Sequence, residues 1–412
     1  MRKNRVAVTG MSAITPFGVG IEIAWEKLIK GHSCIRQIQA FETGNLKTKI
    51  AGEILGIDYN EHLSGLDIHN LDSCTILTLL TVKGLLENKD LGLTSGELRE
   101  GGIIIGTGFG TICSKEENFI RVLAESKPMF PLIIPRAMDN APASEAAIYL
   151  GLKGINQTIF TACSSGLNAI GNAYRLIKDG YENVMIAGGV DTSITKYNLE
   201  AWSKLRVVST RNHDPTGASR PFSKGRDGFV LSDGAGFLLL ENYDKAVERQ
   251  VPIYAEIIGF GATCDAQHIT APSFQEQARA IMLALKEAEI TADDVDYISA
   301  HGTATKLNDV IETKAIKAAL GEKAYAIPIS SLKSQIGHTI GAAGAIELIF
   351  TIQMMLNNTI LPTINFEERD DECDLNYVPN KAIKVGQIRY AIKNSFGFGG
   401  NNASLAIKNP RL

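Results

Sequence analysis

Short apolar runs alternate with amphipathic helical patterns along the whole chain. Apolar runs bounded by glycine and other turn residues predict strands over residues 5–10, 101–108, 183–189, 296–302 and 389–397. Between them, apolar positions recur at helical spacing, as in "EAWSKL", "EQARAIMLALKEAEI" and "IETKAIKAAL". Such alternation is typical of parallel sheets covered by helices, so the sequence predicts an α/β fold.

Two blocks of the chain open in a similar way. The first begins with "NRVAVTGMSAITPFG", and the second begins with "VPIYAEIIGFGATCDA", where a strand again runs into a glycine-containing turn. A chain of 412 residues ordinarily forms two domains or two halves of one. We therefore predict two halves, 1–250 and 251–412, which should pack tightly because no low-complexity linker separates them.

The amino-acid composition of the chain limits which binding partners and which cellular compartment we expect. The net charge of −4, with no basic run, argues against nucleic acid. The most apolar stretch, "GAIELIFTIQMML", contains Glu347 and Gln353 and is too short to span a bilayer. The six cysteines lack the CxxC spacing of zinc sites, and the N-terminus is a poor signal peptide. We expect a soluble cytoplasmic protein that binds no metal and no membrane.

Cys163 stands between a predicted strand, "NQTIF", and a predicted helix that should end near Gly180. A helix N-terminus favours the thiolate form of a cysteine. Small neighbours leave room for a substrate: Ala162, Ser164, Ser165 and Gly166. A lone cysteine is more often buried and inert, so these residues alone support a reactive and a structural thiol about equally.

Two segments place titratable groups at the ends of predicted strands. A strand ends near His301, where parallel sheets display functional side chains, although the residue could equally be a satisfied loop histidine. The next helix should be capped by Asp309 and Glu312. The glycine-rich turn "NSFGFGGNNAS", residues 394–404, can offer backbone N–H groups to a developing oxyanion.

A third segment, "SSLKSQIGHTIGAAGAIE", combines charge with very small residues. Lys333 and His338 precede a helix whose first turns are almost all Gly and Ala, so some part of the molecule must approach that backbone closely. An unpaired Glu347 would be costly in so apolar a helix, and Lys333 is its natural partner.

Together these segments resemble the β-ketoacyl-acyl carrier protein synthases, the type II condensing enzymes of fatty acid and polyketide synthesis. The resemblance covers essentially the whole chain, and its motifs occur in the family's order: "VAVTGMSAITPFG", "TACSSGLNAIG", "ASRPFSKGRDGFVLSDGAG", "AHGTAT", "LKSQIGHTIGAAGAIE" and "NSFGFGG". It implies a thiolase-like fold of two similar βαβαβαββ halves in five layers, αβαβα, usually as a dimer. It also implies substrates carried on the phosphopantetheine of acyl carrier protein, with no other cofactor.

The resemblance implies a catalytic role for five side chains. Cys163 matches the nucleophile that accepts an acyl group from a carrier-protein thioester. His301 and His338 match the histidines that promote malonyl decarboxylation and stabilise the enolate. Lys333, together with Glu347, matches the pair that fixes the charge state and orientation of that site.

Other positions match binding groups of the family. The backbone N–H groups of Cys163 and Phe398 match its oxyanion hole, and Phe398 also matches its gating phenylalanine. Contacts to the pantetheine arm are implied for three threonines: Thr270, Thr303 and Thr305.

Some positions differ from the fatty-acid enzymes of the family. Lys306 stands where they usually have Pro and polyketide ketosynthases often have Lys, and Phe109 stands where many have a smaller residue lining the acyl pocket. The segment "EHLSGLDIHNLD" is not basic, which leaves Lys204 and Arg206 as contacts for an acidic carrier protein. These differences favour a polyketide or polyene ketosynthase, as a homodimer or paired with a homologous chain-length factor. A housekeeping fatty-acid 3-oxoacyl-acyl carrier protein synthase II is the alternative.

Two other classes within the superfamily fit the residues less well. Thiolases carry a second catalytic cysteine in a C-terminal glycine-rich motif, and "GFGGNN" has none. A non-catalytic chain-length factor lacks the nucleophile, whereas this chain retains Cys163, His301, Lys333 and His338.

Overall fold

The computed structural model describes residues 3–87 and 91–411. Five strands from each half of the chain follow one another in a mixed sheet, in the order β11-β10-β14-β15-β9-β1-β8-β7-β5-β6, and the short β2 also pairs with β1. The N-terminal half supplies β1 (Val6–Thr15), β5 (Gly102–Gly106), β6 (Asn156–Ile159), β7 (Val184–Asp191) and β8 (Gly234–Asn242). The C-terminal half supplies β9 (Ala255–Cys264), β10 (Tyr297–Ser299), β11 (Ile329–Ser330), β14 (Tyr390–Gly397) and β15 (Asn401–Lys408).

The two halves repeat one chain path. Among their main elements the first runs β1-α3-β5-α7-β6-α8-β7-β8 and the second β9-α11-β10-α12-β11-α14-β14-β15, which confirms the predicted βαβαβαββ order. Corresponding strands pair in the same sense, because β1–β8 and β9–β15 are antiparallel whereas β5–β6 and β10–β11 are parallel. The helices are α3 (Ser73–Leu86), α7 (Ala141–Leu150), α8 (Ser165–Lys178), α11 (Phe274–Ala288), α12 (Lys306–Leu320) and α14 (Ala343–Asn357).

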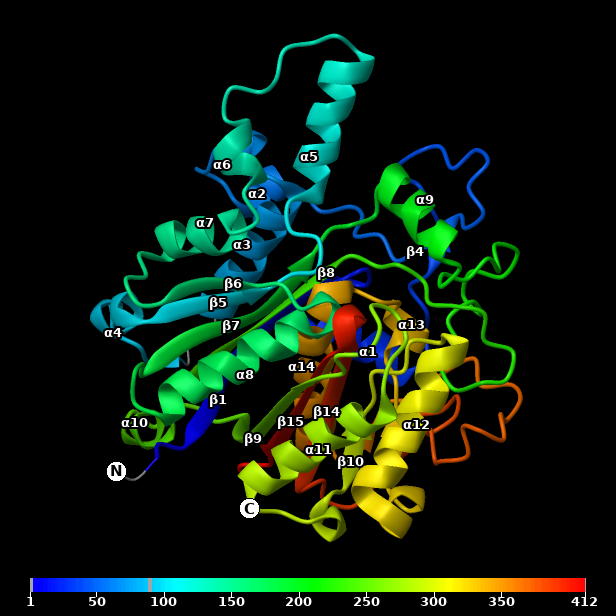
Figure 1. Cartoon of the computed structure of the whole chain (residues 1–412). Coiled ribbons are helices and arrows are strands. Elements are labelled where there is room, and N and C mark those ends of the chain that lie inside the picture. Colours follow the sequence, from blue (N-terminus) through cyan, green and yellow to red (C-terminus); the bar gives the residue numbers. More distant parts are fainter. Residues whose placement is uncertain (1–2, 88–90, 412) are drawn as a thin grey trace.

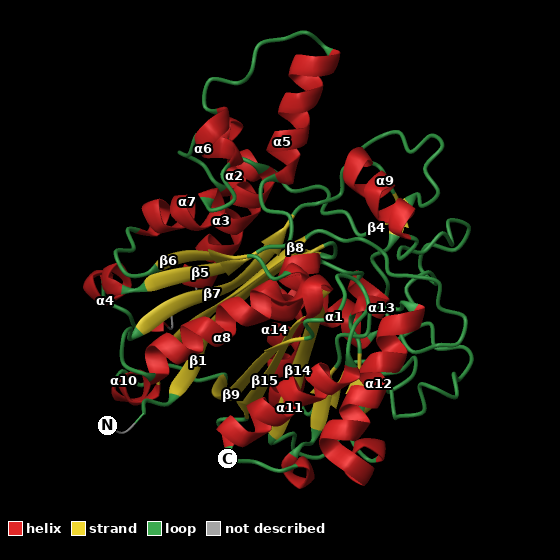
Figure 2. Ribbon diagram, in the orientation of Figure 1, coloured by secondary structure: helices red, strands yellow, loops and turns green. Residues whose placement is uncertain are grey.

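Three helical layers enclose the two sheet halves, as Figure 1 shows. Among the described strands, the sheet halves are joined where three residues of β1 pair with three of β9, and they diverge from that seam. Helices α8 and α14 fill the space between them, while α3 and α7 cover one outer face and α11 and α12 the other (Figure 2). The predicted five-layered arrangement is therefore confirmed.

Shorter elements surround this framework. A segment of the N-terminal half projects away from the sheet at the top of Figure 1 and carries α5 and α6. The additional helices are α1 (Ile21–Ile29), α2 (Tyr59–His62), α4 (Ser95–Glu100), α5 (Ile112–Phe119), α6 (Ile133–Ala137), α9 (Lys196–Leu205), α10 (Tyr243–Glu248) and α13 (Lys333–Ile336). The additional strands are β2 (Gly18–Val19), β3 (Arg36–Gln37), β4 (Ile50–Ala51), β12 (Thr359–Ile360) and β13 (Ile383–Lys384).

Two sequence-based expectations need correction. The segment 394–404 is largely strand, because only the turn around Gly399 and Gly400, both at positive φ, separates β14 from β15. The apolar stretch around Glu347 belongs to a helical run, Ile340–Asn357, of 18 residues, which is long enough to cross a membrane by length and composition. This run is 83% buried between the sheet halves, as expected of a core helix.

Candidate active site

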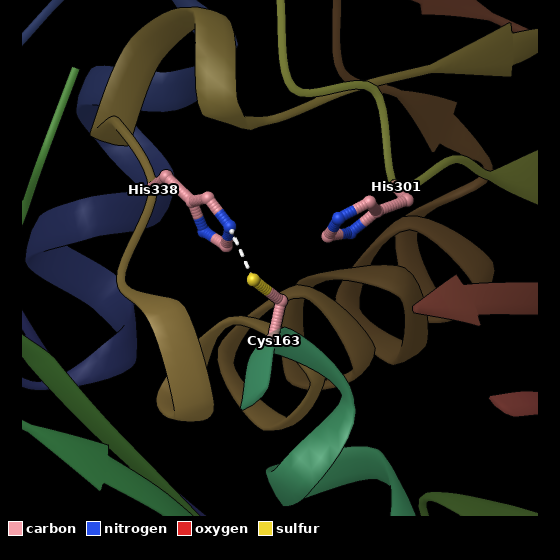
Figure 3. Close-up of side chains that lie close together, drawn as sticks. All are labelled: Cys163, His301 and His338. Atoms are coloured by element: carbon pink, nitrogen blue, oxygen red, sulfur yellow. Dashed lines mark hydrogen bonds between the residues drawn. The ribbon is translucent and has the colours of Figure 1, made fainter. Parts of the chain in front are cut away.

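Cys163 lies at the turn that leads from β6 into α8. A short 3-10 turn, Ala162–Ser164, precedes the first residue of α8, and Ala162 adopts a left-handed backbone with φ of +51°. This conformation is strained for a residue with a Cβ, and such strain gathers at functional sites. The turn holds the thiol at the N-terminal end of α8, facing two histidines (Figure 3).

The histidines come from the C-terminal half of the chain. His301 follows β10, and His338 follows α13 shortly before α14 begins. The His338 Nε2 atom lies 3.1 Å from the Cys163 Sγ atom, and the two imidazole centroids are 5.5 Å apart. Ligand atoms of the three side chains lie within 4.8 Å of one another, a spacing that is compatible with a metal ion as well as with direct catalysis.

Glycines let the two halves meet this closely. A Cβ on Gly166, in α8, would lie 2.5 Å from the Gly341 carbonyl oxygen, and a Cβ on Gly344, in α14, would lie 2.8 Å from the Leu167 amide nitrogen. Contacts this short do not occur for real side chains, so both positions require glycine. The group that approaches the Gly- and Ala-rich helix is thus the start of α8, which carries Cys163.

Both imidazoles are held in the neutral form. Burial, followed by the charge of Lys333, lowers the pKa of His301 and the pKa of His338 well below their ordinary value. The Nδ1 atom of His338 accepts the N–H of Ile340 at 3.2 Å, so in a neutral ring the proton must reside on Nε2. His338 therefore directs an N–H donor toward the sulfur.

The thiol is protonated in this site. Burial raises the pKa of Cys163 from 9.0 to about 12, against the opposing influence of Lys333 and of the backbone N–H groups of Phe398 and Cys163. A helix N-terminus contributes up to ~2 kcal/mol in favour of a negative charge, which is too little to offset this burial. The helix end does not by itself make Cys163 a thiolate, contrary to the simplest interpretation of the sequence.

A buried charge cluster lies behind the histidines. The Glu347 Oε1 atom accepts a hydrogen bond from the Lys333 ammonium at 2.5 Å, and its Oε2 atom forms an ion pair with the Lys393 ammonium at 2.6 Å. All three side chains are at most 1% exposed. Lys333 also donates to the His301 carbonyl oxygen at 2.7 Å, so the cluster holds the His301 backbone. Burial lowers the pKa of Lys393 to about 8.

The Lys333–Glu347 contact agrees with the sequence-based pairing, whereas Lys393 was not predicted. The one signal available for it is a lysine within the apolar strand pattern "RYAIKNSFG".

The loop after β10 is held by two buried carboxylates that sequence analysis assigned differently. Glu312 accepts the N–H groups of His301 and Gly302, each at 2.7 Å, and Asp309 accepts the N–H of Thr303 at 3.0 Å. They do not form the predicted capping pair, because the side chain of Thr305 caps α12 instead. Their tertiary partners outweigh the local capping pattern.

Asp191, at the end of β7, was not predicted as a site residue. Its carboxylate accepts N–H groups from Gly108 at 2.8 Å, Phe109 at 3.0 Å and Gly341 at 2.6 Å. It therefore ties the loop after β5 to the segment between His338 and α14. An aspartate at the end of the apolar run "NVMIAGGVD" was the available signal.

A cavity of about 220 Å³ opens onto the three facing side chains, Cys163, His301 and His338, all of which line it. The predicted pantetheine contacts Thr270, Thr303 and Thr305 line it as well, and so does Phe398. The backbone N–H groups of Phe398 and Cys163 both lower the pKa of the thiol, which is the direction expected of donors that stabilise negative charge.

The remaining predicted residues lie outside the cavity lining. Phe109 packs edge-on against Trp202, with ring centroids 5.8 Å apart, and Trp202 lines the cavity. Lys204 and Arg206 are exposed near the end of α9, close in sequence to the lining residues Trp202 and Val207. The geometry places Phe109 one side chain away from the cavity and the two cations on the surface beside it.

Comparison with known proteins gives consistent matches over the whole chain. The family model "Beta-ketoacyl synthase, N-terminal domain" matches residues 3–246, and "Beta-ketoacyl synthase, C-terminal domain" matches residues 254–367. A 3-oxoacyl-[acyl-carrier-protein] synthase 2 from Synechocystis sp. is 40% identical over 412 residues, covering 99% of each chain. The protein of the same name from Vibrio harveyi is 39% identical over 413 residues, again covering 99% of each chain.

Comparison with solved structures also matches the chain to ketosynthases over nearly its whole length. One solved structure contains a type II PKS acyl-carrier protein in complex with its ketosynthase bound to the hexaketide. The matched chain superposes on this chain with a TM-score of 0.90 at 31% identity, and the match covers 99% of this chain and 100% of that one. The ishigamide ketosynthase/chain length factor superposes with a TM-score of 0.91 at 30% identity, covering 99% of each chain.

We expect the members of the charge cluster to contribute unequally to the free energy of unfolding. Glu347→Gln leaves two buried ammonium groups without a carboxylate, so we expect the free energy of unfolding to fall by about 3–5 kcal/mol. Lys393→Met keeps the Lys333–Glu347 pair and should cost distinctly less. Urea denaturation of both variants measures the difference. Equal losses, or a larger loss for Lys393→Met, would show that Glu347 is not the central charge.

The raised thiol pKa predicts the pH dependence of Cys163 alkylation. Because only the thiolate reacts, the alkylation rate by iodoacetamide should rise steadily from about pH 7 to 9.5 without a plateau. Peptide mass spectrometry separates Cys163 from the exposed Cys264, which serves as the internal reference. A plateau reached below about pH 8 would instead show a thiolate stabilised by the helix end.

Proposed function

The chain belongs to the beta-ketoacyl synthase family, and from that membership we propose that it is a decarboxylating condensing enzyme. It joins an acyl group held on Cys163 to the two-carbon unit of malonyl-acyl carrier protein and yields 3-oxoacyl-acyl carrier protein and carbon dioxide. The observation that carries the proposal is a cysteine sulfur and two neutral imidazoles brought together in one cavity. Carrier-bound thioesters supply both substrates, and the chemistry needs no further cofactor.

Acyl loading uses the sulfur and the backbone donors. The Cys163 sulfur attacks the thioester carbonyl carbon, and the N–H groups of Cys163 and Phe398 bind the oxygen on which negative charge develops. The bond to the carrier sulfur then breaks, and the proton lost by Cys163 ends on that departing sulfur. Since a thioester exchanges for a thioester, the step needs no net change in protonation.

Condensation uses the two imidazoles. The malonyl carbon–carbon bond breaks, carbon dioxide leaves, and the electron pair remains as an enolate whose oxygen accepts N–H donors from His301 and His338. The enolate carbon then attacks the acyl carbon on Cys163, the bond from that carbon to the cysteine sulfur breaks, and a proton from solvent converts the released thiolate back to the thiol. Neutral imidazoles suit this work because they donate hydrogen bonds without first having to lose a proton.

Lys333 and Glu347 act on the two histidines rather than on the substrate. The Lys333 charge lowers the pKa of both histidines, and its hydrogen bond to the His301 carbonyl fixes the loop from which that ring projects. Glu347 stabilises the buried ammonium. We assign both as positioning residues that set the charge state of the imidazoles.

Acyl carrier protein is the proposed partner, and two features support its docking near α9. The relatives are named as synthases of 3-oxoacyl-[acyl-carrier-protein], and a related ketosynthase was solved in complex with an acyl-carrier protein. Lys204 and Arg206 offer exposed positive charge beside the cavity for an acidic carrier. The arm would then pass Thr270, Thr303 and Thr305, which line the route to Cys163.

We also propose assembly with a second copy or with a homologous chain-length factor. Apolar side chains are exposed between the start of α5 and the residue that follows β6, as expected of a surface that another chain covers: Phe119, Leu123, Ile134, Ile148 and Phe160. A related structure contains a ketosynthase and a chain length factor. A cytoplasmic location accords with both partners.

Two pathways remain as candidates, each with its own support. Lys306 and Phe109 favour a polyketide or polyene ketosynthase, since these residues differ from the usual fatty-acid pattern. The 40% identity to a 3-oxoacyl-[acyl-carrier-protein] synthase 2 favours housekeeping fatty-acid synthesis. We propose the polyketide or polyene pathway and keep fatty-acid synthesis as the alternative. The acyl-chain selectivity of the protein distinguishes the two.

Mass spectrometry of the loaded protein tests the proposed function. Incubation with hexanoyl-acyl carrier protein should add one hexanoyl group at Cys163, and malonyl-acyl carrier protein should then convert it to 3-oxooctanoyl-acyl carrier protein. Cys163→Ser should abolish elongation, because a hydroxyl is a far weaker nucleophile. Cys163→Gln, which resembles an acylated side chain, should still release carbon dioxide from malonyl-acyl carrier protein. Product formation at the wild-type rate by either variant would remove Cys163 from the mechanism.

The polyketide assignment predicts a limit on acyl length that Phe109 sets. Without a partner subunit, the wild-type chain should load short acyl groups and reject long saturated ones, because a packed aromatic ring does not yield to extra methylenes. Phe109→Ala should extend acceptance by a few carbons, at about 0.8 kcal/mol per buried methylene. Acylation rates at Cys163 against chain length measure this. Fast loading of a sixteen-carbon group by the unpartnered wild type would return the protein to fatty-acid synthesis.

A further inference from the structure

Gln277 is a buried polar side chain without a protein partner, and it lines the catalytic cavity. It lies in the first turns of α11, is 0% exposed, and shares the cavity wall with Cys163 and Thr303. Within residues 3–87 and 91–411, neither its Oε1 nor its Nε2 atom has a hydrogen-bond partner. A buried polar group left unpaired costs about 1–3 kcal/mol, so this amide is expensive unless something else binds it.

The other buried glutamine of the described chain behaves differently. Gln335 uses its Nε2 atom to donate to the carbonyl oxygens of Leu28 at 2.9 Å and His32 at 3.2 Å, and only its Oε1 atom lacks a partner. Gln335 thus joins two segments of the fold. The Gln277 amide has no hydrogen-bond partner among the residues that the structure describes, so it does not join segments of the fold in this way.

The position of Gln277 on its helix is equally unusual. The buried face of α11 packs against β9 and β15 and is otherwise apolar, with Ala278, Ala280, Ile281, Ala284 and Leu285. Gln277 is the one polar residue of that buried face among those the structure describes. An apolar side chain at this position would pack equally well against β9 and β15. The glutamine amide differs from it in placing a hydrogen-bond donor and an acceptor at the cavity wall.

Gln277 is one of few side chains in the cavity lining that carry a hydroxyl or an amide. Apolar side chains line the cavity from both halves of the chain, among them Trp202 and Phe229 from the first half and Leu307 and Phe396 from the second. The hydroxyl and amide groups of the lining all come from the C-terminal half: Thr270, Gln277, Thr303, Thr305 and Asn308.

We propose that Gln277 is a specificity-determining residue that binds the amide groups of the pantetheine arm during acyl transfer. Its Nε2–H donates to an amide carbonyl oxygen of the arm, and its Oε1 accepts an amide N–H. A saturated acyl chain offers neither group, and the oxo groups of a growing chain offer only acceptors, whereas an amide offers both a carbonyl oxygen and an N–H. This inference rests on the proposed function, because it requires a pantetheine thioester in the cavity.

A series of hexanoyl thioesters that differ in amide content tests the proposal. Hexanoyl-pantetheine carries two amides, hexanoyl-N-acetylcysteamine one, and S-(2-hydroxyethyl) thiohexanoate none. The KM for acylation of Cys163, followed by mass spectrometry, is measured for the wild type and for Gln277→Leu. We expect the substitution to raise the KM for hexanoyl-pantetheine about tenfold, since two hydrogen bonds are lost, and to raise that for the amide-free thioester less than twofold.

The matched control is Gln275→Leu, the same change at an exposed position of α11. It should leave the KM values of the three thioesters in their wild-type ratio. Gln277→Leu should also melt at or above the wild-type temperature, because it removes an unpaired buried amide. Gln277→Met provides a second apolar variant with an unbranched side chain if the leucine does not fold.

The outcomes separate this inference from the proposed function. Equal increases in KM for all three thioesters, or no increase for hexanoyl-pantetheine, would overturn the role of Gln277 while leaving acylation of Cys163 intact. A marked loss of thermal stability in both variants with unchanged KM ratios would assign Gln277 to packing alone. Failure of the wild type to be acylated by any of the thioesters would count against the proposed function itself.

Discussion

The site depends on one carboxylate that two buried ammonium groups share. Glu347 holds Lys333 and Lys393 in a region where none of the three side chains meets water. Burial is the largest cause of the lowered pKa of His301 and of His338, and the positive charges of Lys333 and Lys393 lower both pKa values further. Glu347 balances only one of the two ammonium charges, so the cluster keeps a net positive charge beside the two rings.

The site also depends on the repeat within the chain. Cys163 lies between β6 and α8, and His338 lies between β11 and α14, which are the corresponding places in the two halves. Packing α8 against α14 therefore brings two equivalent turns together, and glycine at positions 166 and 344 allows the contact. The repeat thus supplies the geometry, while different side chains at equivalent turns supply the nucleophile and the donor.

Local patterns in the sequence predicted much of this arrangement, and long-range contacts account for the rest. The strand–helix junction at Cys163 and the small residues before Glu347 are visible in short windows, as is the order of strands and helices. Lys393 and Gln277 could not be assigned, because a lysine in a strand or a glutamine on a helix shows nothing of its distant neighbours. The same cause made the capping prediction for Asp309 and Glu312 wrong, since both bind a loop that folds back onto α12. Residues whose partners lie far away in the chain need the structure.

The central claim is that the histidines act as neutral N–H donors, and the direct measurement is nitrogen NMR of the imidazoles. Protein labelled with ¹⁵N in its histidine rings would be titrated from about pH 5.5 to 8, the range in which an ordinary histidine changes charge. The account predicts that the His338 ring stays neutral, with its proton on Nε2, and that neither His338 nor His301 titrates in this range. An imidazolium at pH 7, or a titration near the ordinary pKa of about 6.5 for either ring, would contradict it.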